Sequence, residues 1–491
     1  MNSNGYDPRR GEIVPVLDRV AAAAKRYHAG LDDLPVIDPA GVRELTRFRT
    51  PLPEEGSGAD AAIRELVEGG VAASAATAGP RFFHWVTGGT TPAALGADWV
   101  TAYLDQQGYA WHGSPLGVEL ELLSLDWLKQ LFGLPAGWAG IMTTGATMAN
   151  FVGLAAARQW WARRHGVDAA EEGLRELPPL PVFCGGYIHA SSVKVLALLG
   201  SGRRVVRRLV RDAQGRIDLD AVEAELRALG GAPSILVAGA GEVNAGEFDP
   251  IEELADLAEE YGAWLHVDGA FGLFAAVSPR TAHLVRGVDR AHSVTVDGHK
   301  WLNVPYDCGF AFVHDGRWMA ESFAYDADYL FDPDDPHPVL GGLGPESSRR
   351  ARSLAVWATL RAYGRNGVRR MIEGHLDLAQ KMATLVDDAP DLERLADVPL
   401  NVVCFRDNPG GLDSDALDRL NRALGQRIME DGRVLAGTTR YAGRVALRPT
   451  VVNWRTRDED VVAFVRIVRE LAGELYAEGA DAPGRVPKGL G

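Results

Sequence analysis

Residues 293–313 read SVTVDGHKWLNVPYDCGFAFV and join two apolar runs across a short polar turn. The runs, at 292–296 and 309–313, are predicted strands, and the turn between them carries Lys300 next to Trp301. A lysine held at a strand end among apolar and aromatic residues is desolvated, which makes its amine a nucleophile of the kind that forms Schiff bases. A lysine that snorkels beside a buried tryptophan would give the same local pattern, so this stretch alone leaves both interpretations open.

Outward from this segment, short apolar runs alternate with amphipathic stretches. Strands are also predicted at 139–142, 181–184, 204–208, 234–238 and 263–267. Between most of them lie predicted helices, at 147–165, 191–199, 218–230 and 249–261. This alternation predicts an α/β fold in which a mostly parallel sheet is covered by helices on both faces. The last two strands are joined by a turn without a helix, so one of them is a candidate for an antiparallel strand.

The sequence on either side of this region predicts two further units. Residues 347–386 read as one or two long helices, and a compact α+β tail follows them. The tail is predicted to contain a strand at 400–405, a helix at 413–429, a strand at 444–452 and a helix at 457–478. We therefore expect an N-terminal segment over 1–90, a large domain over 91–390 and a small C-terminal α+β domain over 391–491.

The composition restricts the class of function. The 491 residues are 46 % hydrophobic and 24 % charged, as in ordinary globular proteins, and the formal net charge of −15 argues against a nucleic-acid partner. No apolar run reaches the ~18 residues of a membrane span, and the N-terminus has no apolar signal region, so we expect no membrane association and a cytoplasmic protein. Cys184, Cys308 and Cys404 lack the spacing of a zinc site, so no metal is expected.

Asp268 is the second candidate for chemistry and lies in His266–Ala270, HVDGA. It ends a predicted strand, and ligands bind at the carboxyl ends of strands in open α/β sheets. A carboxylate in that place is costly unless a cation or hydrogen-bond donors meet it. Such a carboxylate can pair with the protonated ring nitrogen of pyridoxal phosphate (PLP), or it can cap the helix that follows.

Two polar segments follow other predicted strands. In Ile141–Asn150, IMTTGATMAN, apolar residues run into small and hydroxyl residues and then into a helix, whose first N–H groups suit an anion. The segment is neither a GxxxxGK[ST] loop nor a GxGxxG motif. In Tyr187–Ser192, YIHASS, a neutral His189 suits stacking on an aromatic ring or proton transfer, although a lone histidine is more often structural. Together the segments supply an anion site, a stacking histidine, a carboxylate and a nucleophilic lysine.

The order and the residues of these segments resemble the group II PLP-dependent decarboxylases, which include aromatic-L-amino-acid and glutamate decarboxylases. The resemblance extends from about residue 70 to 475. The similar stretches are SPLGVELELLSLDWLKQLFGLP, TTGATMANFVGLAAAR, HASSVKVLALLG, NAGEFDPIEELADLAEEYGAWLHVDGAFG, DGHKWLNVPYDCG and GPESSRRARSLAVWATLRAYGRNG. The resemblance implies PLP-dependent transferase fold type I, with a mostly parallel mixed sheet, and a homodimer with its active site at the subunit interface.

By the same resemblance, four residues would hold the cofactor ring. Lys300 would carry PLP as a Schiff base, and Asp268 would pair with the pyridine nitrogen. His189 would stack on one face of the ring and Ala270 would pack on the other. The resemblance thus gives each of these positions a catalytic or cofactor-binding role.

The phosphate of PLP would lie at the start of the helix that follows Ile141–Gly145. The resemblance places Ala146 and Thr147 in the phosphate cradle, helped by the helix dipole. Asp297 and His299 occupy the turn before the lysine, from which family members also reach the phosphate. A carboxylate near a phosphate is repulsive unless it accepts backbone donors, so His299 is the stronger of these two predictions.

The resemblance also suggests a substrate side of the site. Thr87 aligns with a family threonine near the substrate carboxylate, and Phe83 and Trp85 would line the pocket or belong to the core. Tyr329 matches a tyrosine that the family uses to protonate carbon after CO₂ loss, and it lies in a Gly/Pro/Asp-rich stretch over 325–342 that reads as a closing loop.

The resemblance implies a decarboxylase that acts on an amino acid, with an aromatic side chain favoured. The small-molecule amino acid is then the expected partner. Arg448, in the tail where aminotransferases often bind a carboxylate, keeps another fold type I lyase or an aminotransferase as an alternative. A PLP-binding protein without activity is a further alternative, which Lys300, Asp268, His189 and Tyr329 argue against. The run Ala240–Gly246 departs from the family because Glu242 introduces a charge where a hydroxyl is usual.

Overall fold

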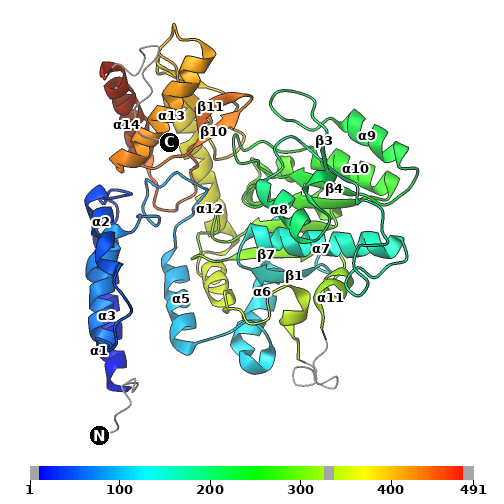
Figure 1. Ribbon diagram of the computed structural model, residues 1–491, viewed down its shortest axis with the longest axis horizontal. Helices are drawn as coiled ribbons and strands as arrows, with labels where there is room; N and C mark the ends of the chain where they lie inside the picture. The colour runs from blue at the N-terminus through cyan, green and yellow to red at the C-terminus, as the bar shows by residue number, and fades with distance from the viewer. Residues whose placement is uncertain (1–9, 326–336, 479–491) are drawn as a thin grey trace.

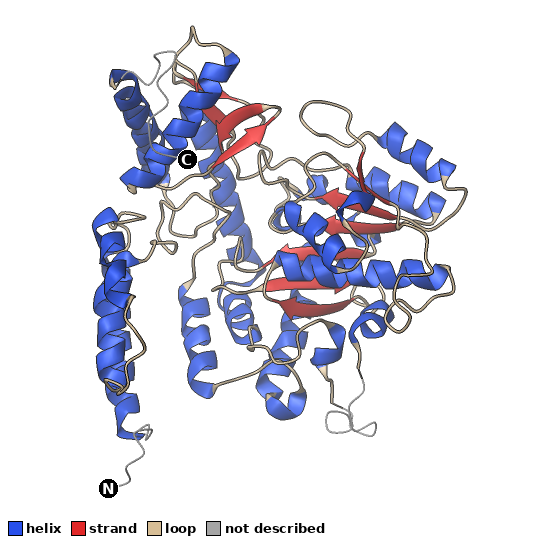
Figure 2. Cartoon of the chain, in the orientation of Figure 1, coloured by secondary structure: helices blue, strands red, loops and turns tan. Residues whose placement is uncertain are grey.

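A seven-stranded sheet occupies the middle of the chain in the computed structural model, which describes residues 10–325 and 337–478 (Figures 1 and 2). Its strands are β1 (Ala139–Thr143), β2 (Val182–Cys184), β3 (Val206–Arg208), β4 (Ile235–Gly239), β5 (Trp264–Asp268), β6 (Ser293–Asp297) and β7 (Gly309–Val313). They lie in the order β1-β7-β6-β5-β4-β2-β3. β7 pairs antiparallel with both β1 and β6, and the other pairs are parallel. The predicted mostly parallel mixed sheet is confirmed.

Helices cover both faces of this sheet, because successive strand residues point to opposite sides. Ile141 enters the core on one face and Met142 enters the core on the other. The first core is shared with α7 (Ala146–Arg164), α8 (Ala190–Leu198) and α11 (Arg317–Phe323). The second core is shared with α6 (Pro115–Phe132), α9 (Leu219–Ala228), α10 (Ile251–Tyr261) and α12 (Ser353–Asp387). Both predicted layers of helices are therefore present.

The outer edge of β1 is covered by two charged side chains. The Glu121 carboxylate accepts a hydrogen bond from the backbone N–H of Met142 at 2.9 Å. The Arg349 guanidinium donates to the carbonyl of the same residue at 3.0 Å. Glu121 and Arg349 also form an ion pair at 2.9 Å, and both side chains are 0 % exposed. Because a buried charge is costly without its partner, each side chain depends on the other.

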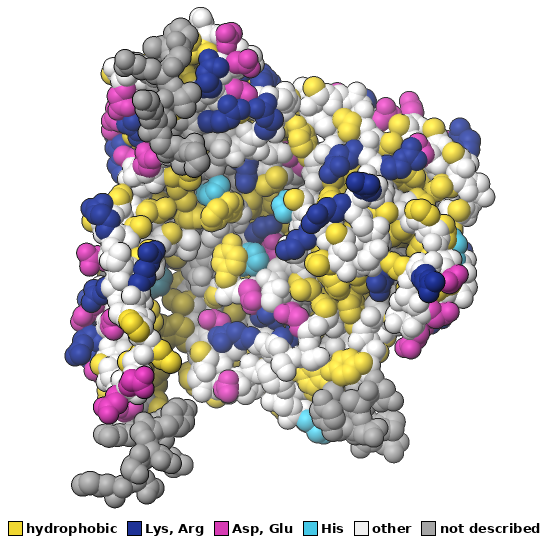
Figure 3. Space-filling model, viewed as in Figure 1, with side chains coloured by type: hydrophobic (Ala, Val, Ile, Leu, Met, Phe, Trp, Pro, Cys, Tyr) yellow, Lys and Arg dark blue, Asp and Glu magenta, His cyan; other side chains and the backbone are white. Residues whose placement is uncertain are grey.

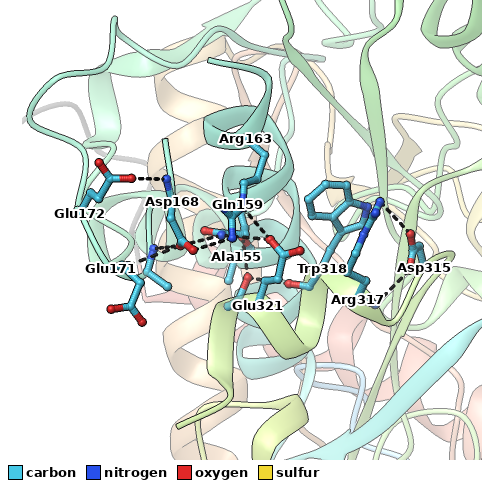
Figure 4. Close-up of polar contacts among 12 residues, drawn as sticks. Ala155, Gln159, Arg163, Asp168, Glu171, Glu172, Asp315, Arg317, Trp318 and Glu321 are labelled. Carbon is cyan, nitrogen blue, oxygen red and sulfur yellow. Dashed lines mark hydrogen bonds and ion pairs between the residues drawn. The ribbon is translucent and has the colours of Figure 1, made fainter. Parts of the chain in front are cut away.

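A network of polar contacts ties the second half of α7 to α11 (Figure 4). Arg163 forms ion pairs with Asp168 at 2.5 Å and with Glu321 at 2.8 Å. Gln159 donates to the same two carboxylates, at 2.9 and 3.4 Å. The network fixes α11 against the helix whose first residues lie at the candidate site.

The C-terminal part is the predicted α+β unit, with a sheet in the order β10-β11-β9-β8. Its elements are β8 (Leu392–Arg394), β9 (Phe405–Asp407), α13 (Ser414–Asp431), β10 (Thr438–Tyr441), β11 (Arg444–Leu447) and α14 (Asp458–Ala477). The strand predicted at 400–405 lies at 405–407 instead. The strand predicted at 444–452 ends at Leu447, shortly before Pro449, which has no N–H to donate to a sheet. α12 packs against both α6 and α14 and so links the two units.

The N-terminal arm, which we define as residues 10–78, forms a helical column at one edge of the molecule (Figure 1). Its longest helices are α1 (Ile13–Gly30) and α3 (Ala59–Glu65), which Arg19 and Asp60 join through two hydrogen bonds of 2.7 and 2.8 Å. α1 has no buried residue, and Ile13, Val14 and Leu17 are 60, 65 and 52 % exposed. Figure 3 shows hydrophobic side chains at the surface of this column.

Within residues 10–325 and 337–478, no helix combines the length and the hydrophobicity needed to cross a membrane.

Candidate active site

A cavity of about 410 Å³ opens at the carboxyl ends of β2, β4, β5 and β6, beside the first residues of α7. Most of the predicted site residues line it: Trp85, Ala146, Thr147, His189, Asp268, Ala270, Asp297, His299 and Lys300. Thr87 and Phe83 are not among the described residues that line the cavity. Tyr329 lies outside the described residues. The fold thus gathers groups from segments that lie more than 200 residues apart at the extremes.

Lys300 and Asp297 form an ion pair in this cavity, with 2.8 Å between the lysine Nζ and the carboxylate Oδ2. The other oxygen, Oδ1, accepts a hydrogen bond from the backbone N–H of Ala146. Asp297 is therefore a carboxylate that accepts a backbone donor, which is the condition under which the sequence allowed it near a phosphate. Because it is only 2 % exposed, its charge depends on these two partners.

Asp268 lies at the end of β5 and accepts three hydrogen bonds. Asn150 Nδ2 and Ser192 Oγ donate to its Oδ2 at 2.9 and 3.3 Å. The backbone N–H of Ala270 donates to its Oδ1 at 3.2 Å. Asp268 lines the cavity, so Oδ1, which takes one bond, is the oxygen with capacity left for a ligand. Sequence reasoning gave no role to Asn150 and Ser192, because both lie inside helices that follow their strands and only the fold brings them to Asp268.

His189 is the N-cap residue of α8. Its Nδ1 accepts from the Ser191 N–H at 3.3 Å and lies 2.6 Å from the Ser191 hydroxyl. Burial lowers the pKa of His189, with the Asp268 carboxylate opposing that effect. The imidazole is therefore neutral at pH 7, and the cap fixes the orientation of its ring in the cavity.

His299 is oriented by a backbone contact and by an aromatic neighbour. The Cys308 N–H donates to its Nδ1 at 3.1 Å, so the proton of the neutral ring is on Nε2, 3.6 Å from Asp297 Oδ1. The ring of Tyr306 stacks on it with 4.1 Å between centroids. Burial lowers the pKa of His299. A Cβ at Gly145, which has a φ of 153°, would come within 2.8 Å of this imidazole, so only glycine fits at the start of α7.

The turn that carries Lys300 is held from two distant parts of the chain. A Cβ at Gly88 would lie 1.7 Å from the Lys300 carbonyl oxygen, so the backbone of the segment before α5 (Pro92–Leu104) packs directly on the turn. Asn303 has a φ of 57° and donates to the carbonyl of Val452 at 2.9 Å. Its side-chain oxygen accepts from the Trp454 N–H at 3.0 Å. The lysine is therefore placed by backbone contacts on both sides.

The predicted substrate residues separate into two groups. Trp85 lines the cavity with 63 % of its surface exposed, and both it and Val86 have positive φ, 55° and 61°, which is costly for bulky and β-branched residues. Thr87 is buried and lies 3.3 Å from the hydroxyl of Tyr306. Phe83 points into the C-terminal core, where its ring packs on Phe464 with 5.0 Å between centroids. Of the three predicted substrate residues, Trp85 is the one that lines the cavity.

Arg448 and Glu242 complete the cavity wall. Arg448 donates to the carbonyl of Val243 at 3.3 Å, and no carboxylate in the described part of the chain lies within salt-bridge distance of it. Burial lowers the pKa of Arg448, and the Glu242 charge opposes this. Glu242 accepts from the backbone and side chain of Asn244, both at 2.8 Å, while burial raises its pKa. Donors from the same loop therefore satisfy the Glu242 carboxylate, whose charge is unusual for the family at this position.

These groups fit what PLP requires of a protein: an amine for its aldehyde, a carboxylate for its ring nitrogen and an anion site for its phosphate. Lys300 is the only lysine among the described residues of the cavity wall, and Asp268 and the N-terminus of α7 supply the other two. On a mostly parallel mixed sheet, this donor set defines a PLP-dependent enzyme of fold type I.

Comparison with known proteins specifies the family. Residues 52–408 match the family described as "Pyridoxal-dependent decarboxylase conserved domain". An aromatic-L-amino-acid decarboxylase of Bacillus atrophaeus is 29 % identical, over 81 % of this chain and 82 % of the relative. An L-2,4-diaminobutyrate decarboxylase of Rhizobium meliloti is 31 % identical, over 95 % of this chain and 91 % of the relative. The crystal structure of Oryza sativa TDC with PLP and tryptamine has a TM-score of 0.87 at 24 % identity and covers 96 % of this chain and 99 % of its own.

The chain therefore belongs to the pyridoxal-dependent decarboxylase family. It is a PLP-dependent amino-acid decarboxylase, a carboxy-lyase, as the resemblance of its motifs predicted.

Proposed function

We propose that the enzyme decarboxylates an aromatic L-amino acid and releases the corresponding amine. The observation that carries the proposal is the exposed indole of Trp85 on the wall of the cavity that contains Lys300. Tyr306 adds a second aromatic ring near the cavity, stacked on His299 and 61 % exposed. Aromatic walls of this kind stabilise an aromatic side chain by edge and face contacts. The Bacillus atrophaeus relative, named for aromatic L-amino acids, supports the same substrate class.

The chemistry divides among residues whose roles we propose as follows. PLP, when bound, supplies an electron sink for the electron pair that departing CO₂ leaves behind. Lys300 Nζ would hold the cofactor's aldehyde, and the Asp297 carboxylate, 2.8 Å away, would fix the position of that nitrogen. Asp268 Oδ1 would accept a hydrogen bond from the ring N–H, and the neutral His189 imidazole would stack on the ring. Ala146 and Thr147, with His299, would hold the phosphate, and Ala270 would pack against the other face of the ring.

Arg448 is our candidate for the group that binds the substrate α-carboxylate. Its guanidinium lines the cavity and suits a carboxylate through charge-assisted hydrogen bonds. Tyr329 stays the proposed donor of the proton to the carbon that loses CO₂; it lies outside the described residues. Thr87 contributes indirectly, through its contact with Tyr306.

A second substrate class is a small amino acid with a cationic side chain. Glu242 on the cavity wall and the Rhizobium meliloti diaminobutyrate decarboxylase both favour it. The aromatic class is preferred because the Glu242 carboxylate is already bonded by Asn244 and faces the positive field of Arg448. A carboxylate satisfied in this way attracts a further cation less strongly.

We also propose that the enzyme is a cytoplasmic homodimer in which the N-terminal arm packs on the partner. The support is the apolar surface of α1, which the chain itself leaves uncovered. We also propose a division into an N-terminal segment (1–90), a large domain (91–390) and a small C-terminal domain (391–491), and α12 ends at Asp387, close to the second boundary.

The proposal is tested by incubating the PLP-loaded enzyme with a mixture of amino acids and reading amines, keto acids and CO₂ by mass spectrometry. We expect amines from tryptophan, tyrosine, phenylalanine or DOPA, with CO₂ in equal amount. Keto acids without CO₂ would indicate an aminotransferase instead, and diaminopropane from diaminobutyrate would indicate the cationic class.

Two variants distinguish these classes at the level of the cavity wall. Trp85→Ala should lower kcat/KM for the aromatic substrate about 10- to 100-fold, through loss of about 1.4–2.8 kcal/mol of contact. Glu242→Gln should leave kcat/KM for the aromatic substrate within about threefold of the parent value. The reverse pattern would assign the cationic substrate.

A further inference from the structure

His266 is a fully buried histidine behind the site that no step above uses. It lies two residues before Asp268 on β5, so both side chains point to the same side of the sheet. α7 passes directly over it: a Cβ at Gly153 would lie 2.8 Å from the imidazole Cε1 and 2.9 Å from Nδ1. The absence of a side chain at Gly153 therefore provides the space that the imidazole occupies.

A continuous chain of hydrogen bonds connects His266 to the Asp268 carboxylate. His266 Nε2 lies 2.8 Å from Asn150 Oδ1, and Asn150 Nδ2 lies 2.9 Å from Asp268 Oδ2. On the other side of the ring, Nδ1 lies 2.8 Å from the Ser293 hydroxyl, to which Trp264 Nε1 donates at 2.9 Å. Except for Asp268, every residue that takes part in these hydrogen bonds is at most 1 % exposed, so water does not compete with the bonds.

The direction of each bond follows from the two ends of the chain. An ionised Asp268 can only accept, so Asn150 must present its NH₂ group to it and its carbonyl oxygen to His266. That oxygen needs a donor, which puts the imidazole proton on Nε2. Nδ1 then accepts from the Ser293 O–H, whose oxygen accepts from the Trp264 indole. Burial lowers the pKa of His266 to about 4, with the Asp268 charge opposing this, so a neutral ring with one proton agrees with this assignment.

All the donors in this chain therefore point toward Asp268. Reversing the direction would turn the Asn150 oxygen toward the carboxylate, and that arrangement requires a proton on Asp268. The chain thus favours the acceptor-only carboxylate, in which Oδ2 is occupied by Asn150 and Ser192 and Oδ1 keeps capacity toward the cavity.

We propose that His266 is a positioning residue for the cofactor: through Asn150 it keeps Asp268 an ionised acceptor, and Asp268 in turn keeps a proton on the pyridine nitrogen. This inference rests on the proposed role of Asp268 toward PLP. It extends the cofactor site one layer deeper, to the imidazole of the HVDGA motif.

The test compares holoenzymes reconstituted with PLP that is isotope-labelled at the pyridine nitrogen, whose protonation is read by solid-state NMR as a function of pH. His266→Phe should lower the midpoint at which the nitrogen loses its proton by about one pH unit, which is tenfold in the protonation equilibrium. His266→Gln, whose amide NH₂ can take the place of Nε2–H, should restore most of that shift. Free PLP affinity, measured by dialysis, should weaken in His266→Phe and recover in His266→Gln.

His375 offers a matched control, because it is also a fully buried histidine whose pKa burial lowers to about 4. Its Nδ1 accepts from Trp301 Nε1 at 2.9 Å and its Nε2 lies 3.0 Å from the Asn453 carbonyl oxygen, with no bond to the chain around Asp268. His375→Phe should destabilise the protein without moving the midpoint of the pyridine nitrogen.

An unchanged midpoint in folded His266→Phe overturns the proposal, as does an equal shift in His375→Phe. If His266→Phe does not fold, Ser293→Ala decides: it removes only the hydroxyl that donates to Nδ1, and its midpoint must fall below that of the parent. If the parent enzyme itself takes up no PLP on Lys300, the proposed function fails instead, which separates the two ideas.

Discussion

The cofactor site and the N-terminal arm treat their side chains in opposite ways. In the site, charged and polar groups are buried and each has partners within the chain, as Asp268 does with Asn150 and Ser192. In the arm, apolar groups such as Val14 and Leu17 are exposed, and α1 buries none of its residues. The polar groups of the site thus take up hydrogen-bonding partners inside the fold, whereas the arm leaves apolar side chains at the surface of the chain.

Loss of the Lys300 amine should change activity more than any other substitution. Lys300→Ala should lower decarboxylation at least about 1000-fold, because no other lysine lines the cavity in the described part of the chain to hold the cofactor's aldehyde. Lys300→Arg should fail equally, since a guanidinium keeps the charge beside Asp297 but stays protonated. Activity and the visible absorbance of bound cofactor are the measurements. Lys194→Ala, at an exposed lysine on α8, is the control and should match the parent.

The buried partnerships of the large domain predict the next effect. Glu121→Gln leaves the Arg349 charge buried and unpaired, which should lower the free energy of unfolding by about 3–5 kcal/mol. The neighbouring Arg350 pairs with Asp98 at the surface, so Arg350→Ala should cost only about 0–1 kcal/mol. Urea unfolding of the holoenzyme measures both. Equal losses would mean that burial of the pair contributes nothing.

The arm gives the converse prediction. Leu17→Asp places a charge among exposed apolar residues, so it should leave the fold of one chain intact but raise the dimer dissociation constant about 100-fold, or about 3 kcal/mol. Sedimentation equilibrium measures the dissociation constant, and Lys25→Ala on the same helix is the control. A parent that sediments as a single chain would contradict the dimer, and a Leu17→Asp dimer of parental strength would place the interface elsewhere.

The last prediction concerns protons in the buried region, and each pH unit changes stability by less than the Glu121→Gln substitution does. Burial lowers the pKa of His266 and His375 to about 4, so between about pH 6.5 and pH 4 the unfolded chain binds more protons than the folded one. Stability should therefore fall as the pH falls through this window, by about 1.4 kcal/mol per pH unit for each such histidine. Asp249 opposes the trend, because burial raises its pKa to about 6 and its folded form holds a proton that the unfolded form has lost.

This pH dependence is checked by the urea midpoint at several pH values. His375→Phe should reduce the slope of the unfolding free energy against pH by the contribution of one bound proton, about 1.4 kcal/mol per pH unit. A slope equal to that of the parent would show that His375 does not remain neutral in the folded protein.

Much of the large domain could be predicted because most of its strands are apolar runs separated by helices. The antiparallel β7 followed from a connection too short to contain a helix. The strands of the C-terminal unit were harder: β10 reads TTRY and is largely exposed, so it has no apolar run. Lys300 and Asp268 could be predicted since each stands at the end of such a run.

The partners of these residues could not be predicted, because they depend on which elements the fold brings together. Asn150 reaches Asp268 from 118 residues away, and Ala146 reaches Asp297 from 151 residues away. Phe83 and Trp85 were given the same alternatives, pocket or core, yet the first joins the C-terminal core and the second lines the cavity. The alternation of apolar residues in the sequence does not show which side chain points into the core and which into the cavity.

The turn that carries Lys300 has a consequence for the order in which the chain matures. The segment around Gly88 packs on this turn, and Val452 and Trp454 form hydrogen bonds with its Asn303. The contacts with Val452 and Trp454 can therefore form only after about 150 further residues have been synthesised. Contacts between such distant parts form late and slowly. We therefore expect nascent chains arrested before residue 452 to capture PLP poorly, and cofactor uptake to begin only after the C-terminal strands have been synthesised.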